Sequence, residues 1–196
     1  MNLKPIFPQK QNDPLQYYYF NNLFQKEEID VIEKEAKRFQ LHRASISSGE
    51  DGGSVRKSNI SWIEASDSTA WIYDRMFGAA EEANNVLWNF NLYNSTDQIQ
   101  YTLYERSEEG HYGAHVDIGP NELSTRKVSI VTQLSAPEDY ENGDLQILQG
   151  DMQWVSVPRG LGLTVVFPSY LYHRVTPVLS GTRKSLVLWA GGEHFK

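Results

Sequence analysis

Residues 126–134 read RKVSIVTQL, and apolar and polar side chains alternate along this stretch as they do in a half-buried β-strand. Four other segments show the same alternation or a short apolar run: IQYTLYER (99–106), DLQIL (144–148), LGLTVVF (161–167) and RKSLVLWA (183–190). Gly, Pro, Asn and Asp separate these segments. Short strands with frequent turn signals predict an antiparallel β-sandwich or barrel in the C-terminal half of the chain.

The sequence before residue 98 has a different texture. Residues 25–39 place apolar side chains at helical spacing, with acids in the first turn and bases in the last, which suits the helix dipole. Residues 68–90 predict a second helix with one broad apolar face. A short strand is predicted at 17–20, and 45–58 predicts a polar loop rich in Gly and Ser.

These patterns predict a mainly β protein with N-terminal helices. We expect residues 1–97 to form a helical support region and residues 98–192 to form the β core. No linker long enough to separate them is present, so the two parts are expected to make one integrated domain.

Composition excludes several kinds of site. The chain has 196 residues, no Cys and a formal net charge of −7. Without Cys it cannot hold a disulfide scaffold, an iron–sulfur cluster, a Cys-ligated zinc ion or a Cys nucleophile. The negative charge argues against a nucleic-acid partner, since phosphate binding usually needs a basic stripe. No membrane-spanning run and no signal peptide is apparent, so we expect a cytoplasmic protein without a membrane partner.

Two histidines and one carboxylate predict a metal site. His115 and Asp117 are two residues apart, so in a strand both side chains point to the same face. His173 stands in YLYHRV, another strand-like stretch. Two His and one carboxylate on one side of a metal are the facial arrangement of non-haem Fe(II) oxygenases. Each signal alone also fits a structural residue, and it is their order along the chain that favours the metal.

A basic residue follows the second histidine. Arg183 comes after a Gly turn and shares a strand face with Ser185. Its planar guanidinium can bind a carboxylate through two parallel hydrogen bonds. The sequence therefore places a candidate anion site beside the candidate metal site.

Several stretches resemble the Fe(II)- and 2-oxoglutarate-dependent dioxygenases of the prolyl 4-hydroxylase-like branch, and within it the PKHD-type hydroxylases. They are QYTLYERSEEGHYGAHVD (100–117), RKVSIVTQLS (126–135), DYENGDLQI (139–147), VVFPSYLYHRVTPVLSGTRKSLVLWAGG (165–192), VRKSNISWI (55–63) and AEEANNVLWNF (80–90). Asn142 stands where the group more often has Gly, and Asn tolerates the left-handed backbone that a turn there would need.

The resemblance implies a double-stranded β-helix, or jelly roll, with iron at its open mouth. It places Fe(II) on His115, Asp117 and His173, which makes these the expected catalytic residues, with O2 and 2-oxoglutarate as the other reactants.

The remaining roles are also implied by the resemblance. The far carboxylate of 2-oxoglutarate would pair with Arg183, helped by Ser185, while Tyr104 and Gln133 would complete the co-substrate site. The substrate would contact Tyr112, Trp189 and Arg56. Arg56 also fits a plain surface charge, and the two aromatic residues also fit packing within the barrel.

The resemblance implies a dioxygenase that hydroxylates a prolyl residue in a peptide or protein and releases succinate and CO2. A hydroxylase of free amino acids or other small molecules remains an alternative, because one fold serves many substrates. From a different class, a metal-binding or sugar-binding jelly roll is also possible. The oligomeric state is left open.

Overall fold

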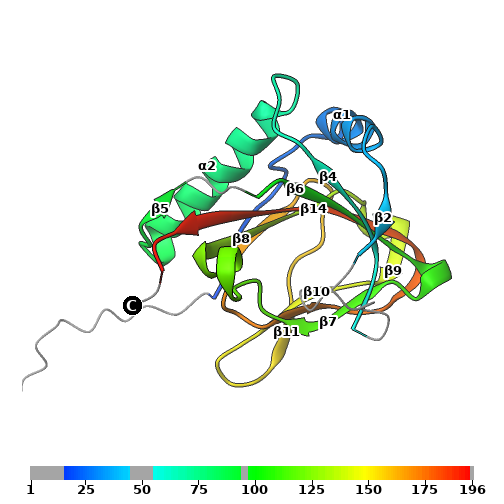
Figure 1. Cartoon of the computed structure of the whole chain (residues 1–196). Helices are drawn as coiled ribbons and strands as arrows, with labels where there is room; N and C mark the ends of the chain where they lie inside the picture. Colours follow the sequence, from blue (N-terminus) through cyan, green and yellow to red (C-terminus); the bar gives the residue numbers. More distant parts are fainter. Residues whose placement is uncertain (1–15, 45–54, 94–96, 195–196) are drawn as a thin grey trace, which may run out of the picture.

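The computed structural model describes residues 16–44, 55–93 and 97–194, and it confirms the predicted jelly roll. Two antiparallel sheets face each other, and both helices lie on the outer side of the larger sheet (Figure 1). The larger sheet has at its centre, in spatial order, β12 (Thr164–Pro168), β8 (Arg126–Gln133), β14 (Val178–Gly192) and β6 (Ile99–Glu105). The smaller sheet runs in the order β11 (Trp154–Ser156), β10 (Leu145–Leu148), β13 (His173–Val175), β7 (His111–His115) and β3 (Arg56–Lys57).

The N-terminal region is less helical than predicted, because it contributes strands to both sheets. Besides β3, these are β1 (Tyr18–Phe20) beside β12, β4 (Asn59–Ile63) beside β6, β2 (His42–Arg43) beside β4, and β5 (Leu92–Tyr93) beside the end of β14. A short β9 (Tyr140–Asn142) pairs with the start of β14. These pairings support the single integrated domain, which we retain as a proposal.

The predicted loop at 45–58 needs a correction at its end. Arg56 and Lys57 form β3, which pairs with Tyr112 and His111 at the edge of the smaller sheet. Residues 45–54 lie outside the described part of the chain. A two-residue strand shows no periodicity, so the sequence alone could not separate it from the loop.

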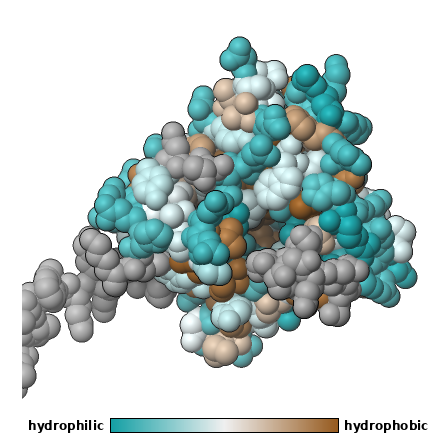
Figure 2. Space-filling view, viewed as in Figure 1, coloured by the Kyte–Doolittle hydropathy of each residue, from teal (hydrophilic) through white to brown (hydrophobic). Residues whose placement is uncertain are grey.

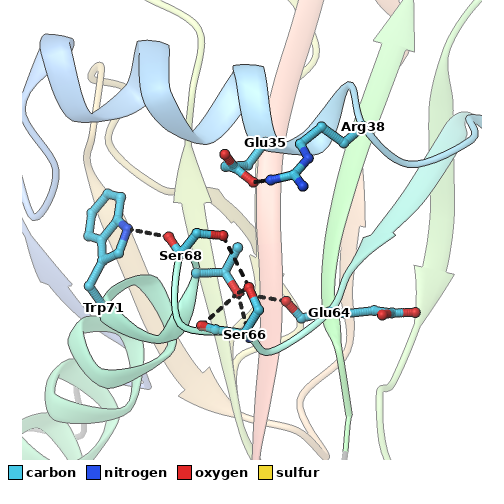
Figure 3. A network of polar contacts seen from close by, with 7 residues as sticks. Glu35, Arg38, Glu64, Ser66, Ser68 and Trp71 are labelled. Carbon is cyan, nitrogen blue, oxygen red and sulfur yellow. Dashed lines mark hydrogen bonds and ion pairs between the residues drawn. The ribbon is translucent and has the colours of Figure 1, made fainter.

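Both predicted helices form and are shorter than predicted. α1 (Lys26–Ala36) replaces 25–39, and the Glu28 carboxylate accepts a hydrogen bond from the Gln25 backbone N–H at its start. At its end Arg38 donates back to Glu35 over 2.7 Å (Figure 3).

α2 (Ala70–Leu87) replaces 68–90, and a polar turn fixes where it begins (Figure 3). The Thr69 hydroxyl donates to the Glu64 carbonyl and accepts from the Ser66 N–H, while the Trp71 indole donates to the Ser68 carbonyl. These bonds satisfy backbone groups that a helix end would otherwise leave free.

The alternation in β8 has a direct structural reason. Val128 and Ile130 face the helices and belong to the core between helices and sheet, whereas Val131 faces the second core between the two sheets. Both faces are therefore buried, and each fully buried aliphatic side chain contributes about 1.5–3 kcal/mol. The space between the sheets is where the candidate site lies.

Two other expectations concern the turn and the membrane. Asn142 has φ 59°, so it adopts the left-handed backbone expected of it. Within residues 16–44, 55–93 and 97–194, no helix is both long and apolar enough to cross a membrane. The cytoplasmic location stays a prediction.

Candidate active site

A cavity of about 330 Å³ opens between the two sheets and collects most of the predicted site residues. The face shown in Figure 2 is hollowed between the sheets, and apolar side chains are visible inside the hollow. The predicted site residues in the cavity lining are Arg56, Tyr104, Tyr112, His115, Asp117, His173, Arg183, Ser185 and Trp189. Gln133 is buried but does not line the cavity.

The candidate metal ligands meet because of strand register. His115 and His173 are direct partners across the antiparallel pair β7–β13, and Asp117 follows two residues after the end of β7. His115 Nε2 lies 3.6 Å from Asp117 Oδ1, and His173 Nε2 lies 3.4 Å from Asp117 Oδ2. One ligand atom from each residue falls within 4.8 Å of the others, which is close enough for one ion.

Backbone carbonyls orient both imidazoles. His115 Nδ1 lies 2.8 Å from the Gly113 carbonyl oxygen, and His173 Nδ1 lies 3.0 Å from that of Leu171. A carbonyl only accepts, so Nδ1 carries a proton, and the neutral form of each ring presents its Nε2 lone pair to a metal. Metal-binding histidines are usually held in this way by an outer partner.

The Asp117 carboxylate is fixed from the opposite side. Its Oδ2 accepts a 2.6 Å hydrogen bond from the Ser129 hydroxyl, which also lies 2.9 Å from that of Ser169. Burial alone would raise the pKa of Asp117, but the imidazoles of His173 and His115, the Ser129 bond and the nearby Trp189 indole lower that pKa to about 2. The carboxylate is therefore charged at neutral pH.

His115 is neutral under the same conditions. Burial, together with the neighbouring His173, lowers the pKa of His115 from 6.5 to about 4. A charged carboxylate beside a neutral imidazole with a free Nε2 is the protonation state that a divalent metal requires.

Tyr112 lies flat against His115, although residues three apart in a regular strand face opposite sides. The ring centroids are 3.5 Å apart at 15°, and β7 carries a bulge at this point, because Val175 pairs with Tyr112 where a regular ladder would use Gly113. The extra residue restores a common face. Arg56 continues the stack with its guanidinium 4.5 Å above the Tyr112 ring.

Arg183 is the largest fully buried side chain among the described residues, with 1% of its surface exposed. Its Nη1 donates to the Ser185 hydroxyl over 3.3 Å, and its guanidinium lies 5.3 Å from the Tyr104 ring. Its Nε and Nη2 have no hydrogen-bond partner in the described part of the chain. Two orphaned donors on a buried cation fit an incoming carboxylate, which would accept both.

Trp189 forms a wall of the cavity and is 4% exposed. Its indole nitrogen approaches Asp117 without reaching hydrogen-bond geometry. Arg126 lies 3.7 Å over the indole and is itself held by two 2.9 Å hydrogen bonds to Asp97. Trp62 contacts Trp189 with ring centroids 6.4 Å apart.

Sequence reasoning missed Ser129, Arg126 and Trp62. Ser129 shares the cavity-facing alternation of β8 and could have been singled out. Arg126 could not, because a register shift between Ala190 and Gly191 brings it to the cavity side of the strand. The role of Gln133 as a co-substrate contact stays a prediction without support from the cavity lining.

Comparisons with known proteins agree with the geometry. Residues 99–191 match the family model described as the 2OG-Fe(II) oxygenase superfamily. A PKHD-type hydroxylase of Gloeothece citriformis is 37% identical over 95 residues, which are 47% of this chain and 43% of the relative. One of Colwellia psychrerythraea is 27% identical over 156 residues, which cover 76% and 68% of the two chains. The chain thus spans less than half the length of the first of these relatives.

Solved structures show the same fold. A prolyl-4-hydroxylase of Pseudomonas putida superposes with a TM-score of 0.70 at 21% identity, covering 91% of this chain and 93% of the other. A prolyl hydroxylase of Trichoplax adhaerens, in complex with a peptide fragment of the hypoxia inducible factor oxygen degradation domain, reaches 0.75 at 16% identity, covering 90% and 83%. The expected resemblance and jelly roll are confirmed.

Proposed function

We propose that this chain, whose residues 99–191 match the model of the 2OG-Fe(II) oxygenase superfamily, is an Fe(II)- and 2-oxoglutarate-dependent dioxygenase that hydroxylates a peptidyl proline and releases succinate and CO2. One observation carries the proposal above the others. A two-His, one-carboxylate set and a buried arginine with two orphaned donors share one cavity, at His115, Asp117, His173 and Arg183.

The residues fit the groups that the superfamily implies. The imidazoles of His115 and His173 and the charged carboxylate of Asp117 would hold Fe(II) on one side and leave its other positions open. When bound, iron would be the centre at which O2, with 2-oxoglutarate as co-substrate, oxidises the substrate. Arg183, with Ser185 beside it, would bind the far carboxylate of 2-oxoglutarate, while Ser129 keeps the Asp117 carboxylate oriented.

The walls of the cavity support a proline substrate. Proline presents a compact apolar ring and lacks an N–H donor, so it suits a site between aromatic faces. Among the aromatic side chains that line the cavity, Tyr112 lies against His115 and the Trp189 indole lies near Asp117. The peptide held by the Trichoplax neighbour supports a peptide substrate by analogy of fold.

The volume of the cavity keeps the small-molecule alternative open. At about 330 Å³ it stands near the lower end of the range for small-molecule sites. A free amino acid would fit it, and a peptide would need to leave most of its length outside. A sugar-binding jelly roll, in contrast, gives no reason for the orphaned donors of Arg183.

The test is succinate release by the full chain with Fe(II), 2-oxoglutarate and a panel of proline-containing peptides and free amino acids, with mass spectrometry of each product. We expect one added oxygen on a peptide proline, matched by succinate. Asp117→Ala should abolish both, because it removes the ligand charge. Asp67→Ala is the matched control, since Asp67 is an exposed carboxylate outside the cavity, and it should keep the wild-type rate.

Oxygen added only to free amino acids would transfer the assignment to the small-molecule alternative. Turnover of 2-oxoglutarate by Asp117→Ala at the wild-type rate would overturn the metal assignment itself.

A further inference from the structure

Arg56 is a second buried arginine in the cavity, and the co-substrate does not account for it. It stands on β3 opposite Tyr112, lines the cavity and is 6% exposed. Its Nε donates to the Ser58 hydroxyl over 2.8 Å. Its Nη2 is buried and has no hydrogen-bond partner in the part of the chain that the structure describes.

Two other arginines of the described structure have the carboxylate partner that Arg56 lacks. Arg126, also in the cavity lining, pairs with Asp97, and Arg43 pairs with Glu108 across the neighbouring turn. Arg56 forms no ion pair with any Asp or Glu of residues 16–44, 55–93 and 97–194. Burying a guanidinium without a carboxylate partner costs folding free energy. Such a position favours the binding of a ligand whose anionic group pairs with the guanidinium.

The charge balance of the cavity points to an anion. Its lining contains three arginines and, among the described residues, one acid, Asp117. Asp117 is already committed to the two imidazoles and to Ser129. Arg126 is neutralised by Asp97, and a 2-oxoglutarate carboxylate would neutralise Arg183. No described acid of the cavity lining is then left to pair with Arg56.

The stacking of Arg56 on Tyr112 gives the position of its guanidinium relative to the candidate metal site. Its guanidinium covers the Tyr112 ring at 4.5 Å, and Tyr112 covers the His115 imidazole at 3.5 Å. The Tyr112 ring therefore lies between Arg56 and His115, a candidate metal ligand. Because this ring separates Arg56 from the candidate metal site, a group bound at Arg56 would belong to the substrate unit beside the one that carries the reacting carbon.

We propose that Arg56 forms a carboxylate-binding subsite, and that the substrate carries a carboxylate next to the hydroxylated residue. This deepens the proposed function and rests on it. The planar fork of Arg56 offers the geometry that a carboxylate accepts. The carboxylate can belong to a Glu or Asp beside the target proline or to the free terminus of a chain that ends at the target.

The experiment is a double-mutant cycle between enzyme and peptide. One proline-containing peptide is prepared with Glu or Gln next to the proline, and a second pair ends at the proline as a free acid or as an amide. Wild type, Arg56→Gln and Arg56→Lys are assayed with each peptide. Arg38→Gln is the matched control, because Arg38 is an exposed arginine paired only with Glu35.

For wild type we expect KM to rise at least tenfold when one of these carboxylates becomes an amide, with kcat little changed. Arg56→Gln should lose this preference, so that the two changes together cost little more than either alone. Arg56→Lys should retain part of it through its charge. The KM for 2-oxoglutarate should be unchanged in both variants, and Arg38→Gln should behave as wild type.

Each other outcome is decisive. Equal KM for acid and amide peptides with wild type would overturn the subsite and leave the proposed function intact. Oxygen added only to a free amino acid, with loss of that reaction in its amide, would overturn the peptide substrate and keep the carboxylate at Arg56. If no peptide is hydroxylated, anaerobic binding of the fluorescein-labelled peptide pairs to wild type gives the same comparison, and equal affinity would overturn the subsite. That readout also stands if Arg56→Gln fails to fold.

Discussion

Replacing Arg183 by Met should abolish co-substrate binding and at the same time stabilise the protein when no co-substrate is present. Arg183 is 1% exposed, and two of its donors, Nε and Nη2, are buried without partners in the described structure. Each buried donor left unsatisfied costs about 1–3 kcal/mol. Met fills a similar volume with no polar group to desolvate.

The interactions that Met would lose are smaller. The 3.3 Å hydrogen bond to Ser185 contributes about 1 kcal/mol. The contact with the Tyr104 ring at 5.3 Å contributes about 0.5–1 kcal/mol. The balance predicts that the free energy of unfolding of Arg183→Met exceeds that of wild type by up to about 4 kcal/mol, as when buried ion pairs are replaced by apolar residues.

Urea unfolding followed by circular dichroism measures this, with and without 2-oxoglutarate and Mn(II). At 100 times its Kd a ligand stabilises the folded state by about 2.7 kcal/mol, so wild type should gain that much and Arg183→Met should gain nothing from 2-oxoglutarate. Arg38→Met, at an exposed arginine, should change stability by no more than about 0.5 kcal/mol. The reasoning is refuted if Arg183→Met is the less stable protein without ligand, or if 2-oxoglutarate stabilises it as much as wild type.

Three further predictions use other parts of the molecule. Gly78 is exposed in the middle of α2 and a Cβ there would meet nothing within 4 Å, so Gly78→Ala should raise the free energy of unfolding by about 0.5–1 kcal/mol in urea without affecting turnover. Asp97→Asn should loosen Arg126 and with it Trp189 beside the metal ligands, weakening Co(II) binding in a spectroscopic titration by roughly tenfold; unchanged affinity would show that the pair serves stability alone. The folded pKa of His115 is lowered to about 4, so the unfolded chain binds the extra proton between pH 6.5 and 4. Stability without metal should therefore be complete above pH 6.5 and fall by at most about 1.4 kcal/mol per unit as pH drops toward 4, with a shallower slope in His115→Gln.

Strands could be predicted from the sequence wherever the alternation of apolar and polar residues was long enough to recognise. β8 and β14 alternate over eight or more residues because one face meets the helices and the other the second sheet. β8 was predicted over its full length, and β14 over residues 183–190, whereas the strand begins at Val178 and runs through the expected Gly turn. β3 was assigned to a loop, because two residues have no period. His115 and Asp117 could be predicted because their two-residue spacing brings both side chains to one side, and this holds although Asp117 lies just beyond the end of β7.

Contacts that depend on an irregular strand could not be predicted from residue spacing. Arg126 faces the cavity through a register shift, and the stacking of Tyr112 on His115 needs a bulge, so parity assigns both to the wrong face. Gln133 shows a different limit. It has the same parity as Ser129, yet only Ser129 contacts Asp117, because parity gives the face of a strand and not the depth along it.

The place of β14 has a consequence for how this chain can be made. β14 contains the latest residues of the described sheets, yet it lies between β6 and β8 and supplies Arg183, Ser185 and Trp189 to the cavity. Until residues 178–192 have left the ribosome, β6 and β8 each expose an unpaired edge, and seven of the eight residues of β8 are buried in the folded protein. The larger sheet therefore closes only after synthesis of its central strand, through contacts distant in sequence, which places folding on the slow side for a domain of this size.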